Sequence, residues 1–439
     1  MTLRPPAALQ ATLRPALRPL GAMWGWLMKL RREAYEAGLL TSAAADRPVV
    51  SVGNLTLGGN AKTPMCLFLA AALARRGLRP AILSRGYGRL RRRDLPDPVV
   101  VSTGEGPLVG AAFSGDEPRL LALRSQAIVV CANQRRLAAE AAVALGADAL
   151  ILDDGFQHLA LKRDLDILMI QAQAPAGDGL VFPAGQLREA FQAQRRAHLL
   201  VAVDRRPAAG PGQAAGQKFG RPSNQAPGRR PGPELDETAA ETTSSKPADG
   251  GGPASGPPPG AQFSFQPSFQ PASQFDFQPD FQSARPPAAR PSTAPRPDPR
   301  LLELARGRPL HLARVEPLGF RRLDGGPLLP LDFPAGQPTA AFCGLARPEA
   351  FLATLAELDL RPAAFEAFSD HVRYGPKKLG ALTALAARSG ARWLLTTAKD
   401  AVKLPPRLPL PTLALETELR LDDPEAFIQK VFAGLQAWT

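Results

Sequence analysis

The sequence predicts an α/β protein built from two domains, each with a mostly parallel sheet. Between residues 48 and 204, short apolar segments alternate with segments of helical periodicity, which is the pattern of a doubly wound sheet. A similar alternation returns after about residue 310. The chain has 439 residues, of which 45% are hydrophobic. It is therefore long and apolar enough for two domains of ordinary size.

Residues 1–45 are predicted to form an amphipathic helix that associates with a membrane surface. Apolar side chains recur there at spacings of three and four residues, with basic side chains beside them. The apolar positions are Leu20, Met23, Trp24, Leu27, Leu30 and Ala34, and the basic ones are Arg14, Arg18, Lys29, Arg31 and Arg32. The alternative is a helix packed on the protein's own core. No apolar stretch reaches the roughly 18–20 residues that span a bilayer, and charges interrupt the run that a cleaved signal peptide needs.

Residues 46–204 are predicted to form the first α/β domain. The expected strands are 48–53, 80–84, 98–102, 127–131, 148–152, 165–170 and 198–203. The expected helices are 63–76, 117–125, 134–145 and 186–195. Strands separated by helices favour parallel pairing, because parallel neighbours need a long crossover connection.

Residues 205–309 are predicted to be a disordered insertion. Pro, Gly, Ser, Gln and Ala dominate up to about residue 299, periodicity vanishes, and Phe-Gln-Pro occurs three times. Proline at this density sustains neither a helix nor a strand ladder. The phenylalanine repeats are either docking elements or an unselected low-complexity expansion, and the second reading is favoured.

Residues 310–439 are predicted to hold a short antiparallel pair and then the second α/β domain. The pair is expected at 311–315 and 320–323. The strands expected in the domain are 339–344, 363–368 and 393–397, and the helices are 348–358, 376–388 and 423–435.

The run from Val49 to Pro64 reads as a buried strand, a glycine turn and a helix that opens with Lys-Thr. Such a turn binds phosphate, because backbone N–H groups face the anion, the lysine adds a charge and the threonine hydroxyl ligates Mg²⁺. The residues predicted to bind nucleotide are Gly58, Gly59, Asn60, Ala61, Lys62 and Thr63. The match to G-x-x-x-x-G-K-[ST] is imperfect, since Thr56 and Ala61 replace two glycines.

Two pairs of carboxylates are candidates for metal binding and proton transfer. Asp153 and Asp154 end an apolar strand, and carboxylates at the carboxyl end of a parallel strand point into the ligand crevice. Asp116 and Glu117 precede a predicted helix. The alternative for the first pair is an ordinary Asp-Gly turn, and for the second a helix cap.

Four other polar loops contain candidate residues. Ser84–Arg89 includes Tyr87 and reads either as an anion-binding turn or as an ordinary basic loop. Arg188, expected on the first turn of a helix, is a candidate phosphate clamp or a surface ion pair. His371 lies beside an aspartate in a polar loop, where histidines often act in catalysis. The stretch 396–403 would line the far wall of a cleft.

Charge and cysteine content narrow the class of protein. The net charge of +13 favours an anionic partner, whether nucleic acid, anionic lipid or a phosphorylated ligand, although arginine-rich codon usage is an equally good explanation. The three cysteines lie far apart in apolar surroundings, which is typical of buried reduced thiols. With four histidines and no His/Cys cluster, a structural zinc site is not expected.

The motifs in this order resemble the tetraacyldisaccharide 4′-kinase family, the lipid A 4′-kinases, over about residues 20–204 and 310–435. The motifs are VGNLTLGGNAKTP, SRGYGR, GDEP, DDGFQH, PAGQLRE and SDHVRY. The resemblance implies two P-loop/Rossmann-like α/β/α domains joined by a short antiparallel β linker. It implies transfer of phosphate from ATP, with Mg²⁺, to the 4′-hydroxyl of a tetraacyldisaccharide 1-phosphate. It also implies a peripheral protein on the cytoplasmic face of the inner membrane, bound to an anionic surface and not to nucleic acid.

The resemblance assigns roles to individual residues. Asp116 would take the proton from the 4′-hydroxyl with His371 as its partner across the cleft, and Tyr87 and Arg188 would hold the sugar or its phosphates. The residues assigned to Mg²⁺ are Thr63, Glu117, Asp153 and Asp154. The departures from the family pattern are Ala61, Gln171, Val372 and Ala398.

Two other functions stay open on the sequence. One is a different P-loop NTPase, which would need no histidine from a second domain. The other is a catalytically impaired homologue that acts as a membrane-bound interaction protein, an idea supported by Ala61 and the Phe-Gln-Pro repeats. At Ala61 a positive φ would cost roughly 1–2 kcal/mol for a residue with a Cβ.

Overall fold

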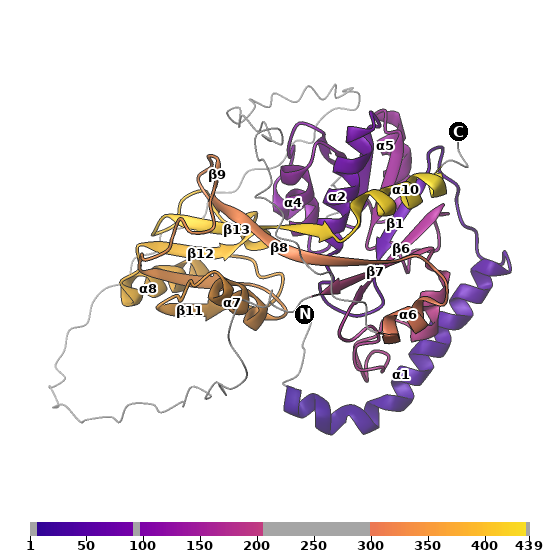
Figure 1. Cartoon of the computed structure of the whole chain (residues 1–439), viewed down its shortest axis with the longest axis horizontal. Helices are drawn as coiled ribbons and strands as arrows, with labels where there is room; N and C mark the ends of the chain where they lie inside the picture. The colour runs from indigo at the N-terminus through magenta and orange to yellow at the C-terminus, as the bar shows by residue number, and fades with distance from the viewer. Residues whose placement is uncertain (1–6, 91–96, 205–298, 436–439) are drawn as a thin grey trace, which may run out of the picture. The chain divides into compact units, whose positions relative to one another are not determined.

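The structure is a computed structural model that describes residues 7–90, 97–204 and 299–435 (Figure 1). Its strands form one 13-stranded sheet over these residues, in the order β11-β10-β12-β13-β8-β7-β6-β1-β5-β2-β4-β3, with β9 paired to β8. The predicted α/β class is confirmed. The predicted disordered insertion lies outside the described residues up to residue 298.

The N-terminal half of the sheet follows the predicted strands closely. Its strands are β1 (Val49–Gly53), β2 (Pro80–Ser84), β3 (Val99–Thr103), β4 (Ile128–Cys131), β5 (Ala149–Asp153), β6 (Leu165–Gln171) and β7 (Leu199–Asp204). All pair in parallel except β3, which is antiparallel to β4. Along β1, Val50 and Val52 belong to one core and Val49 to the core on the opposite face. A strand buried on both faces does not alternate apolar with exposed polar residues, and in β1 even the one polar residue, Ser51, is buried.

Three predicted helices of this half are confirmed, namely α2 (Lys62–Arg75), α4 (Asp116–Arg124) and α5 (Arg135–Ala144). Helices α2 and α4 pack on one face of the sheet and α5 on the other. A four-residue helix, α3 (Ala111–Ser114), precedes α4. The long helix α1 (Ala7–Glu36) lies at the N-terminus.

The helix predicted over residues 186–195 is wrong in its first part. Leu187 and Arg188 donate backbone N–H bonds to Leu180 and Leu55, so this segment pairs with neighbouring loops rather than with itself. A 3₁₀ helix, η1, begins only at Phe191 and ends at Arg196. A periodic sequence does not form a helix when tertiary neighbours bind its backbone groups.

The C-terminal half contains the second predicted α/β unit. Its parallel strands are β10 (Thr339–Cys343), β11 (Ala364–Ala367) and β12 (Trp393–Thr397), with helices α7 (Pro348–Glu357) and α8 (Pro376–Ser389). Helix α9 (Ala398–Ala401) begins in the stretch 396–403, where the sequence indicates a Lys-Asp turn and a helix start, whereas the long strand β13 (Thr412–Leu421) was not predicted. Strand β13 is parallel to β12.

The link between the halves differs from the predicted short pair. The segments 311–315 and 320–323 lie on one continuous strand, β8 (Leu310–Arg322). This strand is parallel to β7 and antiparallel to β13, and the two-residue β9 (Leu328–Leu329) pairs with its end. The predicted disordered insertion, 205–309, is wrong at its C-terminal end, because helix α6 covers Pro299–Ala305. The antiparallel linker of the fold is therefore the β8–β13 pair.

The last helix, α10 (Pro424–Leu435), packs against the first half rather than the second. Its buried Phe427, Ile428 and Val431 share a core with Val50 and Leu165. The sequence analysis placed this helix in the second domain, because it follows that domain along the chain. The chain instead returns along β13 to the first half (Figure 1).

Candidate active site

The segment predicted to bind phosphate (the phosphate turn) lies between β1 and α2. Gly58 has φ of 108°, and Ala61, just before the helix, has φ of 55° and ψ of 26°. The Asn54 amide donates to the Thr56 carbonyl oxygen at 2.7 Å, and Asn54 Oδ1 accepts from Lys62 Nζ at 3.0 Å. No side chain of the N-cap residue Ala61 caps the N-terminus of α2, and uncapped N–H groups at a helix N-terminus are suited to binding an anion.

The backbone of this turn is further stabilised by Asn60. This buried side chain donates to Thr56 Oγ1 at 2.7 Å and accepts from the Gln171 amide at 3.0 Å. Gln171, one of the departures from the family pattern, therefore contacts the turn through Asn60. The predicted role of Gly58 to Thr63 in nucleotide binding stays a prediction.

Ala61 provides the first testable prediction. Its left-handed backbone is strained for a residue with a Cβ, so Ala61→Gly is expected to raise the free energy of unfolding by up to about 1 kcal/mol. The matched control is Ala384→Gly, at an exposed position inside α8, which is expected to lower it by about 0.5–1 kcal/mol. Urea denaturation measures both. A loss of stability in Ala61→Gly equal to that in the control would contradict the strain.

The pKa values of the two aspartates at the end of β5, Asp153 and Asp154, are shifted in opposite directions. Burial alone would raise the pKa of Asp154, but the Lys62 and Arg188 charges outweigh it and lower this pKa to about 2. Asp154 Oδ1 lies 3.3 Å from Lys62 Nζ, and its Oδ2 lies 2.7 Å from Arg188 Nη1. Burial, followed by the charges of Glu117 and Asp154, raises the pKa of Asp153 to about 7. Ser84 Oγ donates to Asp153 Oδ2 at 3.1 Å.

The carboxylates predicted to bind a metal ion fit such an ion electrostatically. Glu117 and Asp154 are close enough to Asp153 to raise its pKa, and a bound cation would favour the charged form of this carboxylate. Among the described residues, however, no group of three or more His, Cys, Asp or Glu side chains is arranged to hold a metal ion. Asp154 instead pairs with Lys62 and Arg188.

Asp116 and His371 meet although they come from the two halves of the chain. Asp116 begins α4, and its Oδ2 lies 3.2 Å from His371 Nδ1. His371 has a φ of 55°, and its ring stacks edge-on against Tyr87 at 4.9 Å between centroids. Ala61, Asp154 and His371 are all non-glycine residues with positive φ. Strained backbone of this kind is concentrated at functional sites.

The structure adds residues that the sequence analysis did not assign. Lys399 and Lys403, on α9 and just after it, reach the same cluster. Lys399 Nζ lies 3.3 Å from His371 Nε2 and 3.9 Å from Glu117, while Lys403 Nζ lies 3.6 Å from Asp116. The signal for them in the sequence was the stretch 396–403, where a strand is followed by a Lys-Asp turn and which was expected to line a cleft.

Tyr87 and Arg188, the predicted acceptor-binding residues, contact different residues. Tyr87 is exposed beside His371. Arg188 lies in a loop rather than on a helix, and its Nη1 donates to both oxygens of Asp154 and to Gln157 Oε1. Its ion pair is thus part of the Lys62–Asp154 cluster and is not a surface pair.

His158, which ends the Asp-Asp-Gly-Phe-Gln-His motif, provides a prediction on pH. Burial, aided by the charges of nearby arginines such as Arg135 and Arg163, lowers its pKa from 6.5 to about 4. The unfolded chain therefore binds a proton at higher pH than the fold does, so stability falls as the pH drops from about 6.5 to 4. We expect His158→Gln to lose part of this decrease, measured by urea denaturation at pH 7 and 4.5. An identical decrease in the variant would show that His158 is not responsible.

Helix α1 contacts the rest of the chain through small residues. Gly21 and Gly25 lie against Val181, and a Cβ at Gly21 would come within 2.7 Å of the Val181 carbonyl oxygen. The large apolar side chains predicted for this helix are at the surface instead of in the core, with Met23 60% exposed. Trp24 Nε1 donates to the Arg188 carbonyl oxygen at 3.0 Å, which ties the helix to the site. No helix in the described part of the chain combines the length and apolarity needed to cross a bilayer.

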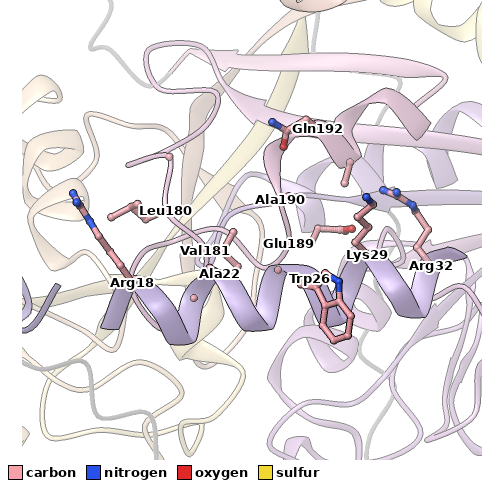
Figure 2. A pocket seen from close by; sticks show the side chains of 15 residues that line it. Arg18, Ala22, Trp26, Lys29, Arg32, Leu180, Val181, Glu189, Ala190 and Gln192 are labelled. Carbon is pink, nitrogen blue, oxygen red and sulfur yellow. The ribbon is translucent and has the colours of Figure 1, made fainter. Parts of the chain in front are cut away.

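A pocket of about 790 Å³ opens between α1 and the 179–193 segment (Figure 2). Figure 2 shows Arg18, Lys29 and Arg32 along the helix, with Leu180 and Val181 opposite. Glu189, next to Arg188 in the chain, also lines it. The pocket thus combines an apolar wall with three basic side chains.

Known proteins resemble this chain in sequence and in fold. The model of the family described as tetraacyldisaccharide-1-P 4′-kinase matches residues 13–246 and 293–436. The tetraacyldisaccharide 4′-kinase of Anaeromyxobacter dehalogenans (strain 2CP-C) is 37% identical, over 86% of this chain and 78% of that protein. That of Geobacter metallireducens is 32% identical, over 94% of this chain and 97% of that protein. A crystal structure of LpxK from Aquifex aeolicus in complex with ATP has the same fold, with a TM-score of 0.63 and 24% identity, covering 96% of this chain and 99% of that one.

Proposed function

Because the chain belongs to the tetraacyldisaccharide-1-P 4′-kinase family, we propose that it transfers the γ-phosphoryl group of ATP to the 4′-hydroxyl of a tetraacyldisaccharide 1-phosphate, a step of lipid A biosynthesis. The main supporting observation is the contact of Asp116 with His371. Lys399 links His371 to Glu117, and the charges of Glu117 and Lys62 both act on Asp153. A nucleotide switch would need no such pair from the second half of the chain. A kinase needs it to handle the proton of an alcohol.

In this function the phosphate turn binds the triphosphate. The N–H groups at the start of α2 and the Lys62 ammonium contact its oxygens, and Asn54 holds Lys62 in place. Asp116 accepts the proton of the 4′-hydroxyl as that oxygen attacks, and His371 orients the carboxylate. A loose transition state needs little help from the base, so correct placement of the two reactants is the main contribution.

Thr63, Glu117, Asp153 and Asp154 would hold Mg²⁺. When bound, the ion would neutralise charge on the phosphate oxygens. Lys62 and Arg188 pair with Asp154, which is one of these four residues. Ala61 is part of the turn, and Gln171 contacts the turn through Asn60. These two departures from the family pattern are therefore the ones expected to affect nucleotide binding.

The acylated acceptor fits the pocket between α1 and the 179–193 segment. Apolar side chains such as Leu180 and Val181 suit acyl chains, and Arg18, Lys29 and Arg32 suit a phosphate group. Arg188 immediately precedes the pocket-lining Glu189, its carbonyl oxygen accepts from Trp24 of α1, and its guanidinium pairs with Asp154. We assign it, with Tyr87, to the sugar or its phosphate.

We further propose that α1 binds the anionic cytoplasmic face of the inner membrane as a peripheral helix. Its exposed apolar residues give it the apolar face that such a helix inserts between lipid headgroups. These residues are Leu20, Met23, Trp24, Leu27 and Leu30.

The membrane proposal predicts a loss of lipid binding without a loss of fold. Met23→Glu with Leu27→Glu removes two exposed apolar side chains and adds charge, so flotation with anionic liposomes is expected to fall at least about tenfold. The control is Leu302→Glu, an equally exposed position on α6. Equal flotation of the double variant and the control would contradict a membrane role for α1.

The activity itself is tested with purified protein, radiolabelled ATP, Mg²⁺ and the tetraacyldisaccharide 1-phosphate. We expect label on the 4′-oxygen of the lipid. Hydrolysis of ATP without lipid phosphorylation would indicate a different P-loop NTPase. Liposome binding without any turnover would indicate the catalytically impaired homologue. Either outcome overturns the proposed function.

A further inference from the structure

Lys403 is a buried cation between the two halves of the chain. Its side chain is 5% exposed, and its Nζ lies 2.9 Å from Asp400 Oδ1 and 3.6 Å from Asp116 Oδ2. Asp400 belongs to the same half as Lys403, whereas Asp116 begins α4 in the other half. A buried ammonium group is costly unless it is paired, so its position is set by these two carboxylates.

Asp400 provides a rigid support for this lysine. The carboxylate is completely buried and accepts hydrogen bonds from the Gly344 N–H at 2.9 Å and the Tyr374 hydroxyl at 3.1 Å. Thr397 Oγ1 lies 2.7 Å from its Oδ2. These groups hold Asp400 against the ends of β10 and β12, and Lys403 is held in turn.

The two contacts to Asp116 engage the same carboxylate oxygen. His371 Nδ1 lies 3.2 Å from Oδ2 and Lys403 Nζ lies 3.6 Å from it. Two partners on Oδ2 fix the rotation of the carboxylate and direct its other oxygen away from them. That second oxygen is then the one that faces the acceptor hydroxyl.

We propose that Lys403 is a positioning residue that holds Asp116 in place for proton transfer from the acceptor hydroxyl. It acts through Asp116 and does not itself touch the substrate. The inference rests on the proposed kinase function for its effect on rate, but its effect on α4 is independent of that function. The competing explanation is that Lys403 only neutralises Asp400.

The matched variants are Lys403→Met and Tyr374→Phe. Both weaken the support of Asp400, but only the first removes a contact to Asp116. We expect Lys403→Met to lower kcat about 10–100-fold with the KM for ATP unchanged, because a misplaced reacting group costs rate and not nucleotide binding. Tyr374→Phe is expected to leave kcat unchanged. Lys403→Arg, which keeps the charge, should recover part of the rate.

A double-mutant cycle tests whether the effect passes through Asp116. In the Asp116→Asn background, Lys403→Met is expected to have no further effect on the residual rate, since the contact that it removes is already altered. A full additional loss in that background would assign Lys403 a purely structural role and overturn the proposal.

Amide hydrogen exchange tests the proposal without any substrate. We expect exchange at the start of α4, residues 116–120, to be about tenfold faster in Lys403→Met and unchanged in Tyr374→Phe. Equal exchange in wild type and Lys403→Met overturns the inference whether or not the protein phosphorylates lipid. Failure of the wild type to phosphorylate lipid, with faster exchange in the variant, overturns the proposed function alone. If Lys403→Met does not fold, Lys403→Gln is measured in its place.

Discussion

Replacing Asp116 by asparagine is expected to lower kcat for lipid phosphorylation by about 10²–10⁴-fold, which is the usual contribution of a general base. Asparagine keeps the size of the side chain and can still contact His371, so the fold and the affinity for ATP should not change. What it loses is the oxygen basicity needed to accept the proton of the 4′-hydroxyl. The measurements are the rate of lipid phosphorylation at saturating ATP and lipid, and ATP binding by calorimetry.

The control for this change is Asp422→Asn, an exposed aspartate at the end of β13. It removes the same charge far from His371 and is expected to leave the rate unchanged. If Asp116→Asn retained the wild-type rate, the assignment of the base would be wrong. A parallel loss of ATP binding would instead place Asp116 in nucleotide recognition.

Replacing Lys62 by methionine is expected to weaken ATP binding by about 10–100-fold, because a charged hydrogen bond is worth about 1.5–3 kcal/mol. Lipid phosphorylation should fall further, since Lys62 also contacts the phosphate while charge develops on it. Methionine keeps most of the apolar stem, so α2 should remain packed on the sheet. Calorimetry with ATP and the lipid kinase assay measure the two effects.

The control for Lys62 is Lys377→Met, an exposed position in the first turn of α8. Both changes remove one positive charge from a helix N-terminus, but only Lys62 follows the glycine turn. Equal ATP affinity in the two variants would exclude the turn between β1 and α2 as the phosphate site. Asp154 keeps its ion pair with Arg188 in Lys62→Met, so a general collapse of the cluster is not expected.

Most strands of the sheet could be predicted because their sequence is apolar on both faces. In β5, for example, successive residues from Ala149 to Leu152 enter opposite cores, so the run is apolar until Asp153. Helices α2 and α5 were predictable for the related reason that a helix packed on one face of a sheet shows apolar periodicity. These signals are local, so they do not depend on how the rest of the chain folds.

The failures have a common physical cause, which is pairing between distant segments. Residues 186–190 have helical periodicity, but their backbone groups bond to Leu55 and Leu180. Strand β8 crosses Pro317 without ending, since β13 lies beside it along its length. Helix α10 joins the first core because the returning β13 places Phe427 there. None of these partners is adjacent in the chain.

The sequence by itself determined the α/β class, the phosphate turn at Gly58–Thr63 and the set of motifs that resembles the lipid A 4′-kinases. It also raised the question of φ at Ala61, which the structure answers with 55°. These features are local, because a turn or a strand depends mainly on neighbouring residues.

Only the tertiary structure decided which charged groups act on one another. The contact between Asp116 and His371 spans 255 residues, and Lys403, just after α9, joins it. Charge interactions depend on distance and burial rather than on order along the chain. The environment of Asp116 therefore comes from the packing of the two halves, while the identity of its neighbours in sequence says only that it begins a helix.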